Sequence, residues 1–270
     1  MPAALAAAVV AAARLRPEAM DRAAGAIGVA VGWLAAVAML DLAPLVPPAA
    51  RSWQWLPMLV AGAAVMGSLK LRPWMNVVAG VLGASLTAGI LVPDWENLAP
   101  SRGRLQLLLV AGAAAIWAMQ FLADRLLGRW IPAALAVAGL AAAIVLERSG
   151  TARFAQMAGA LAAALVGAAA LGTRSQVISG CVPAAAIILP GALVSGWLNS
   201  HSAVPLGSYL LAGSAPLALF VPAGRGWRFF PPAMVVVLAT AAIALAMWAE
   251  PIDWAAAFAE PGPPAAQPVP

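Results

Sequence analysis

Residues 177–197 read VISGCVPAAAIILPGALVSGW, a run of 21 residues without a charged side chain. A hydrocarbon core about 30 Å thick is crossed by roughly 20 mostly apolar residues in a helix, so this run is long enough to span a bilayer. The rest of the chain has the same character, since 64% of its 270 residues are apolar and only 9% are charged. Soluble proteins have about 45–50% apolar and about 25% charged residues, so this composition excludes a water-soluble domain. Intrinsic disorder is excluded as well, because disordered chains are poor in apolar residues.

Apolar runs separated by charged residues and prolines predict an all-α integral membrane protein, a polytopic bundle of about nine transmembrane helices. The runs are 24–43, 54–69, 74–93, 105–123, 130–146, 154–172, 177–197, 204–222 and 233–250. They lack the alternation of apolar and polar residues that the strands of a membrane β-barrel show. The runs 54–69 and 130–146 are the shortest, and the bilayer can thin locally around a short span.

The predicted domain organisation is a single transmembrane helical domain at 24–250 with a short segment on each side. Residues 1–23 are expected to form a cytoplasmic or interfacial segment, because the alanine-rich stretch 3–13 is too short to span and has no basic residue before it. Residues 251–270 are expected to form a disordered tail, since five of the last ten residues are proline.

The basic residues predict that the N-terminus is inside and the C-terminus outside, because short loops rich in Lys and Arg stay cytoplasmic. In this orientation ten basic residues lie on the inner side and five on the outer side. Nine of the eleven tryptophans fall at predicted span ends, and only Trp33 and Trp117 lie within a span. The net charge of +5 therefore reflects topology, and no nucleic-acid partner is expected. The expected location is the inner (cell) membrane, and the expected partner is the lipid bilayer.

Residues 179–214 contain the candidate binding site. Two prolines fall inside the seventh run, and an interior proline kinks or breaks a helix. Neighbouring interrupted helices form the binding sites of many transporters. The same region holds the only Cys, the only His and the only Tyr of the chain. The candidate residues are Ser179, Cys181, Pro183, Pro190, Ser195, Asn199, His201, Ser208 and Tyr209. The alternative interpretation is a hairpin of two packing helices joined by a polar outer turn.

Six acids are expected at the outer face, namely Asp41, Asp94, Glu96, Glu147, Glu250 and Asp253. They could line a vestibule that attracts cations. Alternatively, the acidic outer face follows from the depletion of basic residues there and has no function.

Small residues recur at the spacing of helix contacts, as in membrane helix pairs. They predict either an interface with a second copy or a membrane partner, or packing within one bundle. The residues concerned are Gly28, Gly32, Gly159, Ala163 and Gly167.

The sequence contains no pattern that indicates catalysis. A zinc site needs three or four Cys, His or carboxylate ligands, and one Cys and one His do not supply them. The Gly-Arg-Gly at 224–226 lacks the Gly-Lys that completes a P-loop. We therefore expect no catalytic residue, metal or cofactor.

Two functions fit these observations. The first is a permease for a neutral or amphipathic small molecule or lipid, because the predicted spans contain almost no charged side chains that would bind an ion. The alternative is a non-catalytic membrane subunit or scaffold that packs with partner helices.

The orientation can be tested with a reporter that is active only outside the cytoplasm. Fused after Pro270, such a reporter is expected to be active, because nine spans place the two ends on opposite sides of the membrane. A control fusion in the 69–73 connection is expected to be inactive. The reverse pattern would contradict the predicted orientation.

Overall fold

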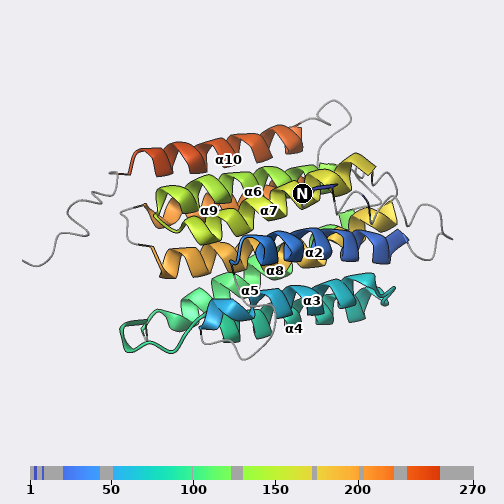
Figure 1. Cartoon of the computed structure of the whole chain (residues 1–270), viewed down its shortest axis with the longest axis horizontal. Coiled ribbons are helices and arrows are strands. Elements are labelled where there is room, and N and C mark those ends of the chain that lie inside the picture. The colour runs from blue at the N-terminus through green and yellow to red at the C-terminus, as the bar shows by residue number, and fades with distance from the viewer. Residues whose placement is uncertain are drawn as a thin grey trace, which may run out of the picture.

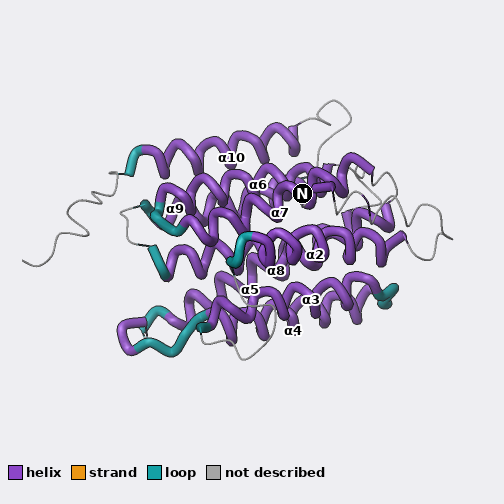
Figure 2. The backbone as a smooth tube through the Cα atoms, in the orientation of Figure 1, coloured by secondary structure: helices purple, strands orange, loops and turns teal. Residues whose placement is uncertain are grey.

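The computed structural model describes residues 3, 4, 8, 21–42, 51–98, 100–122, 130–171, 175–200, 204–221 and 230–249. Within these residues the chain forms nine α-helices and no strand, and the helices run side by side (Figures 1 and 2). The helices are α2 (Asp21–Met39), α3 (Leu56–Ser68), α4 (Pro73–Leu91), α5 (Arg102–Ala118), α6 (Trp130–Arg148), α7 (Ala152–Leu171), α8 (Ser175–Leu198), α9 (Leu206–Ser214) and α10 (Phe230–Met247). Short 3-10 segments are η2 (Ser52–Trp55), η3 (Glu96–Leu98), η4 (Met119–Leu122) and η5 (Ala215–Phe220).

Each of the nine predicted runs corresponds to one of these helices, which confirms the prediction of an all-α membrane bundle. Seven helices of the described residues are long and apolar enough to cross a membrane. The other two are α3, with 13 residues, and α9, which continues as η5. The run 130–146 is not short in the structure, because α6 extends to Arg148 and has 19 residues. Most of the predicted N-terminal segment 1–23 and all of the tail 251–270 lie outside the described residues.

The outer faces of the peripheral helices are apolar. On α4 the side chains of Trp74 and Leu82 are each 63% exposed, and on α10 Val237 is also 63% exposed. Apolar patches of this kind on a soluble protein would mark a binding surface or cause aggregation. Together with the helix lengths, they identify the chain as a multi-pass α-helical membrane protein.

Helix α8 is the centre of the bundle. Every residue from 177 to 193 is buried, and α8 contacts α2, α3, α4, α5, α6, α7 and α9. Helix α10 lies at the edge, where it packs against α6, α9 and η5 (Figure 1). The uncharged sequence of α8 suits this position, because a helix that is apolar on all sides can be buried on all sides.

Helices α2 and α8 touch through their backbones at two glycines. A Cβ atom at Gly25 would overlap the carbonyl group of Val177, and one at Gly180 would overlap the carbonyl oxygen of Arg22. On the neighbouring side of α8, a Cβ at Gly67 of α3 would lie 3.0 Å from the ring of Pro183. Small residues at such positions allow helices to approach closely in lipid.

Pro183 and Pro190 do not break α8, which is continuous through both positions. The sequence-based prediction allowed either a kinked or a broken seventh helix, and the broken alternative is wrong. Membrane helices tolerate interior proline, because neighbouring helices and local adjustments satisfy the freed backbone groups. The eighth span does change its geometry, since the α-helix ends at Ser214 and a 3-10 helix follows.

The two tryptophans within spans are buried and hydrogen bonded. Trp33 Nε1 donates to the carbonyl of Met157 at 2.9 Å, which joins α2 to α7. Trp117 Nε1 donates to Asn76 Oδ1 at 3.2 Å, which joins α5 to α4. Buried indole N–H groups usually find such partners, so these bonds fix the pairing of the helices.

One arginine ties three elements together at the end of the bundle where α2 begins. Arg22 Nε donates to the carbonyl of Gly67 at 2.9 Å, and its Nη2 donates to Gln120 Oε1 at 2.6 Å. The side chain therefore joins α2 to the end of α3 and to η4. Its charge is partly withdrawn from solvent, and such charge-assisted bonds compensate for the loss of hydration.

The contact between α2 and α8 can be tested with two alanine substitutions. Gly180→Ala is expected to lower the free energy of unfolding by about 3 kcal/mol or more, because the new methyl group meets a carbonyl that cannot rotate away. Gly62→Ala is the matched control, since nothing lies within 4 Å of a Cβ there. Denaturant unfolding in detergent, followed by near-UV circular dichroism, measures both. Equal stabilities would contradict the proposed backbone contact.

Candidate functional site in a groove between α5, α8 and α9

A groove of about 360 Å³ lies between α5, α8 and α9. Helix α8 forms its floor, with Pro190, Leu193, Val194 and Trp197. These positions follow the i, i+3, i+4, i+7 spacing that places residues on one face of a helix. The α5 wall consists of Leu105, Leu108, Leu109, Ala111, Gly112 and Ala115. The opposite wall consists of Leu206, Tyr209, Leu210, Gly213 and Ser214 of α9 and Leu217 of η5.

The groove opens on the apolar surface of the bundle. Helices α5 and α9 each pack on α8, and α5 also meets η5, which continues the α9 wall. The groove is open along its side, where Leu108, Leu206 and Leu210 are 47%, 41% and 46% exposed. Because this surface faces hydrocarbon in a membrane, a ligand would enter from the lipid phase.

Among the described residues that line the groove, Ser214 and Tyr209 carry hydroxyl groups and Trp197 carries an indole N–H. Ser214 is exposed, and its Oγ is 3.4 Å from the carbonyl of Leu211. Tyr209 is 4% exposed. Its hydroxyl faces those of Ser149 and Ser200, but it makes no hydrogen bond of normal geometry with any described residue. The hydroxyl is therefore enclosed in the protein next to these two serines, and it is the ring of Tyr209 that lines the groove.

Of the predicted site residues, Pro190 and Tyr209 are the two that the structure places in the groove. Pro190 comes from the middle of α8 and Tyr209 from the first turns of α9.

Three other predicted residues lie near the beginning of α8 and pack against neighbouring helices. Cys181 is buried, with its Sγ atom 3.2 Å from the carbonyl of Val177 and 3.6 Å from that of Gly25. Ser179 Oγ donates to the carbonyl of Gln176 at 3.0 Å. Pro183 contacts α3. At a rise of about 1.5 Å per residue, Cys181 lies roughly 14 Å along the helix axis from Pro190.

The remaining predicted polar residues lie near the other end of α8 or in α9. Asn199 Nδ2 donates to the carbonyl of Ser195 at 2.7 Å. Ser195 and Ser208 are buried, and their hydroxyls have no hydrogen-bond partner among the described residues. His201 lies outside the described residues.

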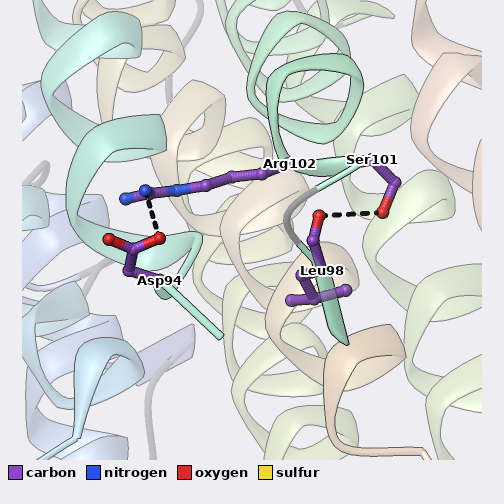
Figure 3. Close-up of polar contacts among 4 residues, drawn as sticks. All are labelled: Asp94, Leu98, Ser101 and Arg102. Carbon is purple, nitrogen blue, oxygen red and sulfur yellow. Dashed lines mark hydrogen bonds and ion pairs between the residues drawn. The ribbon is translucent and has the colours of Figure 1, made fainter. Parts of the chain in front are cut away.

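Three of the predicted outer acids, Asp41, Asp94 and Glu96, are exposed, at the ends of helices or between them. Asp41 follows α2 with a φ of 48°, a left-handed conformation that ends the helix. Asp94 Oδ1 pairs with Arg102 Nη1 at 2.6 Å across the connection between α4 and α5 (Figure 3). Glu96 belongs to η3 in the same connection. The Asp94 side chain is 80% exposed, and exposed ion pairs contribute at most about 1 kcal/mol to stability.

The small residues predicted as an interface fall into two groups. Gly28 and Gly32 are buried within the chain, and a Cβ at Gly167 would overlap the carbonyl of Ala3. Gly159 and Ala163 lie on the surface side of α7, where they line two further grooves, one toward α2 and one toward α6.

The α5 wall carries no sequence signal that marks it as a site. Its residues read as an ordinary apolar helix, and only their position opposite α9 makes them a wall. A Cβ at Gly112 would meet no heavy atom within 4 Å, so this glycine leaves open space in the groove.

A polar turn between α6 and α7 was also not predicted from the sequence. In this turn the Ser149 Oγ and Thr151 Oγ1 atoms lie 2.8 Å apart.

The chemistry of the groove suits apolar binding. The described residues contain no group of three or more His, Cys, Asp or Glu side chains that could hold a metal ion.

No protein-family model, curated protein or solved structure matches the chain. The function therefore has to be argued from the groove itself.

Removing the Tyr209 hydroxyl distinguishes a packing group from a ligand contact. Tyr209→Phe is expected to change the free energy of unfolding by less than about 1 kcal/mol, because the hydroxyl has no partner to lose. Trp117→Phe is the comparison. It is expected to lower the free energy of unfolding by about 1–3 kcal/mol, because it leaves the buried Asn76 oxygen without a hydrogen-bond donor. Thermal unfolding in detergent measures both. A larger loss for Tyr209→Phe would show that the hydroxyl is bonded within the fold.

Proposed function

We propose that the protein is an inner-membrane permease for an amphipathic small molecule or lipid, and that the groove between α5, α8 and α9 binds its substrate. The observation that carries this proposal is an apolar cavity open to the lipid-facing surface, with Pro190 in its floor and Tyr209 in its wall. Ligand sites are typically cavities of about 300–1,000 Å³ lined by apolar side chains with a few polar groups. The groove has this size and composition.

The nature of the lining limits the substrate. None of the described residues that line the groove is charged, and a charged ligand group would be costly to bury there. The portion bound in the groove is therefore apolar, and any polar portion lies at the mouth of the groove.

The floor of the groove is the part of α8 best suited to move. Proline at position 190 lacks a backbone N–H, so the carbonyl of Ala186 loses its usual partner within the helix. This weakens α8 at the level of the groove. A change of curvature there would alter the distance between the floor and both walls.

A second function is supported by a different feature. The two grooves beside α7 share Gly159 and Ala163, and small residues on a lipid-facing surface allow a partner helix to approach closely. A non-catalytic subunit that docks a partner at α7 would need no substrate in the groove between α5, α8 and α9. Crosslinking from α7 in native membranes would then capture a partner chain.

The permease proposal can be tested by filling the groove. Gly112→Phe is expected to abolish transport, because the phenyl ring occupies the open space beside α5. Gly62→Phe on α3 is the matched control, since Gly62 has equally open surroundings but does not line the groove. The measurement is the movement of fluorescent phosphatidylcholine between the leaflets of liposomes, followed by reduction of the fluorophore with dithionite.

Wild-type protein and Gly62→Phe are expected to expose inner-leaflet lipid to dithionite, and Gly112→Phe is expected not to. A fluorescent fatty-acid analogue loaded inside the liposomes serves as a smaller amphipathic probe. Absence of movement for both probes with the wild-type protein, or equal movement with both variants, would contradict the proposal.

A further inference from the structure

The groove spans the depth of one bilayer leaflet. On α5 its lining runs from Leu105 to Ala115, which is about 15 Å at a rise of about 1.5 Å per residue. The hydrocarbon core of a bilayer is about 30 Å thick, so one leaflet contributes about half of that. The groove begins in the first turn of α5 and ends near the middle of the bundle. Its length therefore matches the acyl chain of a lipid in that leaflet.

An unpaired cation lies at the leaflet-surface end of the groove. Arg104 precedes the wall residues Leu108 and Ala111 by four and seven positions, so the three residues share one face of α5. Arg104 is exposed and makes no ion pair or hydrogen bond with any residue that the structure describes. Residues four apart on a helix lie about 5–6 Å apart, so the guanidinium group lies one turn above the groove.

Arg102, the other arginine in the first turn of α5, points away from the groove entrance and is already paired. Arg102 extends from the start of α5 toward the end of α4, where it pairs with Asp94 (Figure 3). Among the residues described, no acid is paired with Arg104. The charge above the groove is therefore available to an anion.

The first turn of α5 adds to this positive potential. Ser101 precedes the helix, but its Oγ donates to the carbonyl of Leu98 and does not cap the helix (Figure 3). The first backbone N–H groups of α5 thus have no side-chain cap, and such groups attract anions. Arg104 and these N–H groups lie at the same level.

We infer that the groove holds one acyl chain of an anionic glycerophospholipid, with the lipid phosphate at Arg104. This inference rests on the proposed function, because it names the substrate class of the same groove. The acyl chain contacts the α5 and α9 walls and the floor at Leu193 and Val194. The ester region lies at the depth of Tyr209, whose ring forms part of the α9 wall. The phosphate interacts with the guanidinium group at the headgroup level.

The inference can be tested by photocrosslinking in nanodiscs of equal parts phosphatidylglycerol and phosphatidylcholine. Trace lipids of the two headgroups carry the same diazirine-labelled acyl chain, so they differ only in the headgroup. Mass spectrometry of the irradiated full-length protein locates the labelled peptides. Wild-type protein is expected to show labels on α5 and α9, with phosphatidylglycerol favoured over phosphatidylcholine.

Arg104→Gln is expected to reduce this headgroup preference roughly fivefold, the effect of about one cation near the membrane surface. Arg104→Lys should retain it. Arg51→Gln is the matched control, because Arg51 is an exposed arginine that precedes α3 and is not part of α5. Thermal unfolding of each variant confirms that the fold is intact.

The outcomes separate this inference from the proposed function. If Gly112→Phe removes the labels from both lipids but Arg104→Gln leaves the headgroup preference unchanged, the groove binds lipid and the phosphate assignment is wrong. Equal labelling of the wild-type groove by the two lipids would also overturn the assignment. If Gly112→Phe leaves the labels in place, lipid does not occupy the groove and the inference fails, whereas the permease proposal fails only if Gly112→Phe and Gly62→Phe also give equal movement in the transport assay.

Discussion

The backbone contact between α2 and α8 is the constraint on which the rest of the bundle depends. Helices in lipid gain little from burying apolar surface against each other, so close packing and hydrogen bonds must hold them together. Gly25 and Gly180 remove the side chains that would separate the two backbones. Helix α2 is then fixed to α7 through Trp33 and to α3 through Arg22. The other helices complete the enclosure of α8.

The groove exists because this enclosure is incomplete on one side. Helices α5 and α9 both rest on α8, but α9 is short and changes to 3-10 geometry at Ala215. Gly112 supplies no side chain to fill the remaining space. The result is a cavity with an apolar lining, one helical turn from an arginine that pairs with no described residue. A cavity placed in this way is suited to a molecule that already resides in the membrane.

The helices were predictable because the thickness of the hydrocarbon core demands long apolar runs, and all nine runs became helices. Two details differ in the structure. The fifth run is longer in the structure than its apolar segment, because α6 includes polar residues up to Arg148. The seventh is not interrupted, because the helices around α8 keep it continuous through Pro183 and Pro190. The polar region around 179–214 pointed to Pro190 and Tyr209, but Ser179 and Cys181 lie too far along the same helix to join them. The α5 wall has an unremarkable sequence and could not be predicted.

The sequence by itself determined the class of the protein, because apolar length and scarce charge allow only membrane-spanning helices. It also predicted which runs become helices, since each run must satisfy its own backbone hydrogen bonds in hydrocarbon. Only the tertiary structure decided which helix is central and which residues meet in the groove. The central position of α8 and the lining of the groove depend on how small side chains on different helices fit together. Such contacts join residues far apart in the chain, such as Gly25 with Val177, and no local pattern specifies them.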